Sequence, residues 1–270
     1  MGRIEETFAR LKQRNEKALI PFITAGDPNI QVTEQIITEL IAAGADIIEL
    51  GMPFSDPMAD GPTIQASSER ALAAGTTLHN VLELVARVRT YSQIPIVLMG
   101  YYNPIYSYGG QCFAEHAKHA GVDGLLLVDL PPEERDELAV FTAPLGIHLI
   151  TMLAPTTPPQ RSADLLAVAQ GFVYYVSMTG VTGTAKVDSA AIQVKVNQLC
   201  EQSPVPVAVG FGITSAADAG SISRFSDAVV VGSALVNVIK QYAESPRLLE
   251  EVHRFVRELK QGILDATDNK

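Results

Sequence analysis

The sequence is poor in cysteine and has no long apolar run. Its 270 residues include two cysteines, Cys112 and Cys200, without a paired spacing, so we expect two reduced thiols and no disulfide framework. No apolar run approaches the roughly 18 residues that a membrane span needs. The N-terminal stretch is amphipathic and lacks the apolar core of a secretion signal. These absences predict a cytoplasmic protein.

Positive charge is also scarce. Thirty acidic residues stand against 20 basic ones, which gives a formal net charge of -10, and no block of lysine or arginine stands out. An acidic surface repels nucleic-acid phosphates and anionic lipids, so we expect neither nucleic acid nor membrane as a partner. If the ligand carries a phosphate, backbone amides are expected to hold it rather than side-chain cations.

Motifs for metal binding and for nucleophilic catalysis are missing as well. The five histidines form no His-x-His or His-Glu-x-x-His cluster, so we expect no metal site. No Gly-x-Ser-x-Gly elbow occurs, and the expected strands contain no lysine that could form a Schiff base.

Short apolar, β-branched segments alternate with helical patterns along the chain. Near-continuous apolarity is typical of parallel strands that are covered on both faces. The helical stretches carry apolar stripes at helical spacing. The expected strands are Leu19–Thr24, Asp46–Gly51, Ile94–Met99, Gly124–Asp129, Gly146–Leu153, Phe172–Ser177, Val205–Gly210 and Asp227–Val231. The expected helices include Gln31–Ala43, Leu78–Arg89, Cys112–His119, Glu133–Phe141, Ser162–Ala169, Ser189–Cys200 and Leu248–Gly262.

This strict alternation predicts a single (β/α)8 TIM barrel over residues 1–270, with an extra N-terminal helix. The alternative is an open doubly wound sheet, which usually has a glycine-rich turn after its first strand. Residues 24–28 read Thr-Ala-Gly-Asp-Pro instead, which favours the barrel. In such barrels the catalytic residues follow the carboxyl ends of the strands.

Glu49 is the main candidate catalytic residue at these strand ends. It lies between Ile48 and Leu50, so alternation directs it to the barrel axis if those two face the helices. Burial would raise its pKa toward the range of a general acid or base. A salt bridge to a barrel arginine or lysine is the alternative, but the expected strands contain neither. Asp60 follows on the same rim, where turn or helix-capping chemistry would also explain an aspartate.

Glycines follow each of the last three expected strands. They allow a close backbone approach, and helix N-termini beside them offer N–H groups to an anion. The loop Met178–Asp188 is either a lid over the substrate or a plain surface loop. In the pairs Tyr101-Tyr102 and Tyr174-Tyr175, alternation turns one ring inward.

The stretch Glu49–Gln65, ELGMPFSDPMADGPTIQ, resembles the signature of the tryptophan synthase alpha family. The resemblance extends over essentially the whole chain, in the order that the family has. Its further motifs are Pro21–Pro28, Met99–Pro104, Asp129–Glu134, Gly180–Gly183, Gly210–Ile213 and Gly232–Ala234.

The resemblance implies a retro-aldol cleavage of indole-3-glycerol phosphate to indole and glyceraldehyde 3-phosphate, without metal or cofactor. By resemblance Glu49 is the acid and base, Asp60 holds the indole N–H, and Tyr174 is the active-site tyrosine. The other implied residues are Gly183, Gly212, Gly232 and Ser233 for the phosphate, Phe22, Tyr101 and Phe211 for the indole pocket, and Thr182 for the lid.

The resemblance also implies a partner. The family works as an α2β2 complex with a beta subunit, which carries the pyridoxal phosphate and receives indole through a tunnel. The implied contacts are the loops 53–60, 103–109 and 129–132, with Pro53 and Asp56 among them. A stand-alone indole-releasing lyase, a non-catalytic subunit that regulates a partner, and a generic sugar-phosphate isomerase are the alternatives.

Overall fold

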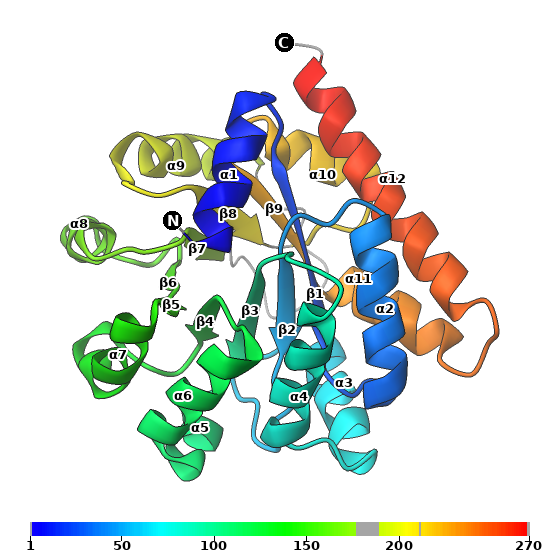
Figure 1. Cartoon of the computed structure of the whole chain (residues 1–270). Helices are drawn as coiled ribbons and strands as arrows, with labels where there is room; N and C mark the ends of the chain where they lie inside the picture. Colours follow the sequence, from blue (N-terminus) through cyan, green and yellow to red (C-terminus); the bar gives the residue numbers. More distant parts are fainter. Residues whose placement is uncertain (1, 177–188, 211, 269–270) are drawn as a thin grey trace.

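The computed structural model describes residues 2–176, 189–210 and 212–268 (Figure 1). Within these ranges parallel strands form one nine-stranded sheet in the order β5-β4-β3-β2-β1-β9-β8-β7-β6. The strands are β1 Ala18–Thr24, β2 Ile48–Gly51, β3 Ile96–Gly100, β4 Gly124–Leu127, β5 His148–Leu149, β6 Thr151–Leu153, β7 Val173–Val176, β8 Val207–Gly210 and β9 Ala228–Val231.

The fifth expected strand is split into β5 and β6. β5 pairs with β4, whereas β6 pairs with β7. β5 and β6 are therefore the two ends of the sheet order, yet Ile150 alone separates them in the chain. The sheet returns to itself as a (β/α)8 TIM barrel, which confirms the predicted fold class.

Helices cover the outside of this barrel (Figure 1). The predicted extra N-terminal helix is present as α1, and none of the described helices is long and apolar enough to cross a membrane. The helices are α1 Arg3–Gln13, α2 Ile30–Ala42, α3 Pro62–Ala73, α4 Leu78–Arg89, α5 Tyr102–Tyr108, α6 Gly110–Ala120, α7 Asp136–Thr142, α8 Pro159–Ala167, α9 Ser189–Gln202, α10 Ala216–Ser223, α11 Ser233–Tyr242 and α12 Leu248–Asp268.

One expected loop is wrong: residues 103–109 fall almost wholly in the helix α5. The helix begins at Tyr102, whose backbone N–H donates to the Asp129 carboxylate at 2.7 Å. Asp129 follows β4 and is 27 residues away in the chain. Because the carboxylate that caps the helix follows a neighbouring strand, the local sequence pattern does not reveal the start of the helix.

The core has two layers, because strand side chains alternate between the helices and the barrel interior. Leu19 and Ile23 of β1 pack outward against the helices, whereas Ile20 packs inward. The apolar face of α1, with Ile4 and Phe8, belongs to the inner layer. The helix α1 therefore closes the amino-terminal end of the barrel.

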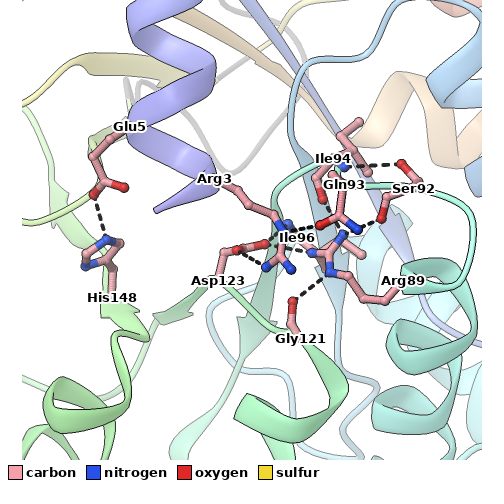
Figure 2. A network of polar contacts seen from close by, with 10 residues as sticks. All are labelled: Arg3, Glu5, Arg89, Ser92, Gln93, Ile94, Ile96, Gly121, Asp123 and His148. Atoms are coloured by element: carbon pink, nitrogen blue, oxygen red, sulfur yellow. Dashed lines mark hydrogen bonds and ion pairs between the residues drawn. The ribbon is translucent and has the colours of Figure 1, made fainter. Parts of the chain in front are cut away.

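Polar contacts hold α1 in this place (Figure 2). The Asp123 carboxylate accepts from the backbone N–H of Ile96 at 2.8 Å and pairs with Arg3 at 2.9 Å and with Arg89 at 2.7 Å. Beside it, Glu5 of α1 lies 2.7 Å from the His148 ring. These contacts lie at the amino ends of β3, β4 and β5, which leaves the carboxyl ends free for a functional site.

Candidate active site

Glu49 is buried in β2 and its side chain is 2% exposed. Its neighbours Ile48 and Leu50 pack in the outer layer, and its register partner Val97 packs in the inner one. Among the described residues, neither carboxylate oxygen has a hydrogen-bond partner. Burial, with a smaller contribution from the charge of Asp60, raises the pKa of Glu49 to about 8. A protonated carboxyl group is therefore available near neutral pH.

Asp60 lies in the loop before α3, whose N-cap is Gly61. Burial raises the pKa of Asp60 to about 6, and a hydrogen bond from Tyr101 opposes this rise. The Tyr101 hydroxyl accepts from the backbone N–H of Ala59 at 2.9 Å, so its own proton is free to donate to Asp60. Tyr101 thus fixes the position of the carboxylate and favours its ionised form.

A narrow cavity adjoins Asp60 at the carboxyl ends of β1, β2 and β3. Its volume is about 10 Å³, which is room for about one water molecule. Any ligand larger than a water molecule therefore requires the lining to move. The lining residues are Phe22, Thr24, Gly51, Met52, Asp60, Ile64, Ser68, Met99, Gly100, Tyr101 and Val128.

This cavity brings together three of the predicted site residues, Phe22, Asp60 and Tyr101. Glu49 does not line it, but its register partner Phe22 and the nearby Gly51, at the end of the same strand, do. Sequence reasoning missed several lining residues. Alternation at the strand ends is the signal that could have found Met99 and Val128, because both pack on the inner layer.

Tyr174 lies on β7 close to Glu49. Burial, followed by the charge of Glu49, raises the pKa of Tyr174 well above its usual value. A Cβ atom added to Gly210 would lie 2.4 Å from the Tyr174 hydroxyl oxygen. A Cβ on Gly51 would lie 2.7 Å from the Phe22 ring. Glycines at the ends of β8 and β2 therefore leave the space in which these two rings lie.

The described phosphate candidates lie after β8 and β9. Gly212 has a φ of +60°, a conformation that favours glycine, and an added Cβ would meet nothing within 4 Å. Gly232 is the N-cap of α11, and Ser233 is its exposed first residue. Helix N-termini carry free N–H groups that suit an anion. The remaining predicted positions, Gly183, Phe211 and Thr182, lie outside the described residues, as does the expected lid, residues 178–188.

The expected partner-contact segments carry exposed side chains. Asp56 is exposed and Pro53 is half-buried in the loop after β2. Met58 in the same loop is 88% exposed, and Tyr106 of α5 is 69% exposed. Exposed large apolar side chains are a feature of interaction surfaces when they form a patch.

The barrel and its two carboxylates with raised pKa define the class of protein, namely a (β/α)8-barrel enzyme equipped for acid–base chemistry at the carboxyl ends of its strands. Residues 8–264 match the tryptophan synthase alpha chain family, and the chain belongs to that family.

Individual relatives agree with this assignment. The tryptophan synthase alpha chain of Citrifermentans bemidjiense is 53% identical over 267 residues, which are 99% of this chain and 100% of the relative. The crystal structure of tryptophan synthase subunit alpha from Legionella pneumophila superposes with a TM-score of 0.91 at 38% identity, covering 98% of this chain and 99% of that one. A chain of the tryptophan synthase complex from Pyrococcus furiosus gives a TM-score of 0.82 at 38% identity, covering 90% and 98%.

Proposed function

We propose that this chain is a carbon–carbon lyase that cleaves indole-3-glycerol phosphate into indole and glyceraldehyde 3-phosphate, in tryptophan biosynthesis. Membership of the tryptophan synthase alpha chain family supports the reaction. The observation that carries the mechanism is Glu49, a buried carboxyl group without a partner among the described residues.

Glu49 moves the protons in this proposal. With a pKa of about 8 its carboxyl group is largely protonated at neutral pH and gives its proton to the indole ring carbon that bears the glycerol chain. The carboxylate that results takes the proton of the adjacent glycerol hydroxyl. The carbon–carbon bond then breaks, its electron pair returns to the ring, and the aldehyde forms. Glu49 ends in the protonated state in which it began.

Asp60 acts as the electrostatic partner. Its carboxylate accepts the indole N–H and stabilises the positive charge that protonation creates on the ring. The protonated ring is itself the electron sink, so the family needs no cofactor, and pyridoxal phosphate belongs to the beta subunit. Tyr174 lies close to Glu49 and is the third catalytic residue of this proposal, beside Glu49 and Asp60.

Two groups of residues bind the rest of the substrate in this proposal. The first lines the indole pocket and the second holds the phosphate through backbone amides and one hydroxyl group. They are Phe22, Tyr101 and Phe211 for the indole, and Gly183, Gly212, Gly232 and Ser233 for the phosphate. Thr182 belongs to the proposed lid.

The partner in this proposal is a tryptophan synthase beta subunit in an α2β2 heterotetramer. Support comes from the alpha-chain name of the relatives and from the solved complex of Pyrococcus furiosus. Pro53 and Asp56 contact the beta subunit in this proposal, and the exposed Met58 and Tyr106 belong to the same proposed contact segments. We further propose that residues 1–270 form one domain and that the protein acts in the cytoplasm.

One assay tests this function. The full chain is mixed with indole-3-glycerol phosphate, with and without a beta subunit, and indole release is followed. We expect indole in both cases and faster release with the partner. Release that the partner does not change would favour a stand-alone lyase. No release from the folded chain under either condition would refute the function.

A further inference from the structure

A second cavity lies in the barrel wall, away from the carboxylate pair. β4 pairs with β5 through Gly124 and Leu125, and β6 pairs with β7, so the wall is open between the rest of β4 and β6. A cavity of about 350 Å³ occupies this opening. It shares only Val128 with the cavity beside Asp60, and neither Glu49 nor Tyr174 lines it.

The cavity has an apolar body of leucine side chains. These come from β4 and the loop after it, from the two halves of the split strand and from α8, which lie next to one another along the barrel (Figure 1). An engineered apolar cavity of about 150 Å³ binds benzene. The larger space here suits a flat ligand of two fused rings. The leucines are Leu125, Leu127, Leu130, Leu149, Leu153 and Leu165.

A cation lines one side of the cavity. Arg135, just before α7, is half-buried and donates to the carbonyl oxygens of Leu149 and Val168, both at 3.2 Å, and to the Gln170 side chain at 3.5 Å. All these acceptors are neutral, and no described carboxylate forms an ion pair with Arg135. The adjacent Asp136 acts on it through its charge alone, so the guanidinium can still pair with an anion in the cavity.

The other polar residues of the lining differ from Arg135. Arg161 is paired with Glu133 at 2.6 Å, and the Asp129 carboxylate accepts from Tyr102. The Thr157 hydroxyl accepts from Ala154. Thr151 has a buried hydroxyl group without a partner among the described residues. The cavity therefore offers one cation that forms no ion pair among the described residues and one hydroxyl group without a partner among them, beside an apolar body.

We propose that this cavity binds an aromatic carboxylate of two fused rings, with the rings among the leucines and the carboxylate on Arg135. The arrangement matches the general form of ligand sites, which combine an apolar lining with a few polar groups that fix orientation. The site lies outside the carboxylate pair, so it does not depend on the proposed cleavage reaction.

Calorimetric titration of the full chain with 2-naphthoate and with neutral 2-naphthylmethanol tests the charge requirement. We expect 2-naphthoate to bind about tenfold more tightly, as expected for a charge-assisted hydrogen bond. Arg135→Gln should remove this preference and Arg135→Lys should retain it, whereas Arg161→Gln, at the paired arginine, should leave it unchanged. Equal affinities for the two probes, or no binding of 2-naphthoate at millimolar concentration, would overturn the proposal.

A second set of variants tests the location. Leu165→Phe fills the cavity and should weaken 2-naphthoate binding at least tenfold. Val168→Phe is the matched control, because Val168 is the C-cap of the same helix, its side chain is 53% exposed, and it meets Arg135 only through its backbone carbonyl. Asp60→Asn should leave 2-naphthoate binding unchanged. Binding that survives Leu165→Phe and is lost in Asp60→Asn would place the ligand in the substrate pocket and refute the second site.

Discussion

At the scale of single residues, Glu49 and Asp60 have different pKa values because their surroundings differ. Glu49 is buried without a hydrogen-bond partner among the described residues, and its pKa is about 8. Asp60 receives a hydrogen bond from Tyr101, and its pKa is about 6. Between these values Glu49 is protonated while Asp60 is ionised, which is the state that the proposed mechanism requires.

The pH dependence of cleavage follows from these two values. We expect kcat/KM to rise through about pH 6 as Asp60 ionises and to fall above about pH 8 as Glu49 loses its proton. Tyr101→Phe removes the hydrogen bond that lowers the pKa of Asp60, so the acid limb should move to higher pH. The alkaline limb should stay in place. A profile in which Tyr101→Phe moves neither limb would contradict this assignment.

The contact between Gly210 and Tyr174 supplies a second residue-scale prediction. Gly210→Ala places a Cβ atom where the Tyr174 hydroxyl lies, so the ring must move from its place beside Glu49. We expect kcat/KM to fall at least about tenfold while the protein stays folded, because displaced catalytic groups lose positioning. The double variant Gly210→Ala with Tyr174→Phe removes the nearest clashing atom. Its phosphate-ligand affinity should equal that of Tyr174→Phe, and a lower affinity would mean wider damage.

At the scale of elements, acidic residues fix the amino ends of the strands. Asp123 accepts from the start of β3, Asp46 accepts from β1, and Asp227 accepts from β8. Each aspartate also forms an ion pair. Asp123 pairs with Arg3 and Arg89. Asp46 pairs with Lys260, and Asp227 pairs with Lys17. These contacts join helices or loops distant in the chain to neighbouring strands of the barrel.

Asp123→Ala should test this role. Asp123 is 8% exposed, and its loss leaves the half-buried Arg89 and the Ile96 N–H without their partner (Figure 2). Breaking a buried pair costs about 3–5 kcal/mol, so the free energy of unfolding in urea should fall by that order. Activity per folded molecule should not change, since the site lies at the opposite barrel end. Glu133→Ala, in an exposed ion pair, is the control and should hardly affect stability.

Elements with a strong local pattern could be predicted from the sequence. Apolar β-branched runs located the barrel strands, and alternation placed Glu49 on the inner side. The split at Ile150 and the helix α5 could not be predicted, because both depend on partners far along the chain. β5 and β6 pair with different strands, and Asp129 caps α5. The cavity beside Asp60 also joins residues of several elements that no local pattern connects.

At the scale of the whole molecule, one end of the barrel carries both the carboxylate pair and the proposed partner face. Met58 lies two residues before Asp60 and is 88% exposed. A subunit that binds there can shift the loop that holds Asp60, which gives a direct route from partner binding to catalysis.

Met58→Asp should therefore weaken activation by a beta subunit and leave the basal cleavage rate unchanged. The charge would be buried in the interface, and a desolvated unpaired charge opposes association. Val140→Asp is the matched control, since Val140 is 63% exposed on α7 and belongs to none of the proposed contact segments. Titration of each variant with beta subunit, with indole release as readout, gives the comparison. Equal activation of both variants would show that Met58 does not lie in the interface.

Replacing the buried carboxyl group of Glu49 should also change how the free energy of unfolding depends on pH. The pKa of Glu49 in the folded protein, about 8, lies above the ordinary glutamate value of 4.5, so ionisation opposes folding as the pH rises between these values. Glu49→Gln carries no such charge. The variant should be at least as stable as the parent at pH 8, which separates a catalytic loss from unfolding.

The most direct measurement is the rate of indole release by Glu49→Gln, with the affinity for glycerol 3-phosphate determined on the same preparation. We expect cleavage to fall to the detection limit while the phosphate ligand still binds with parental affinity, since the amide can neither give nor take the proton. Near-parental indole release by the folded variant would contradict the role of Glu49 and the mechanism built on it.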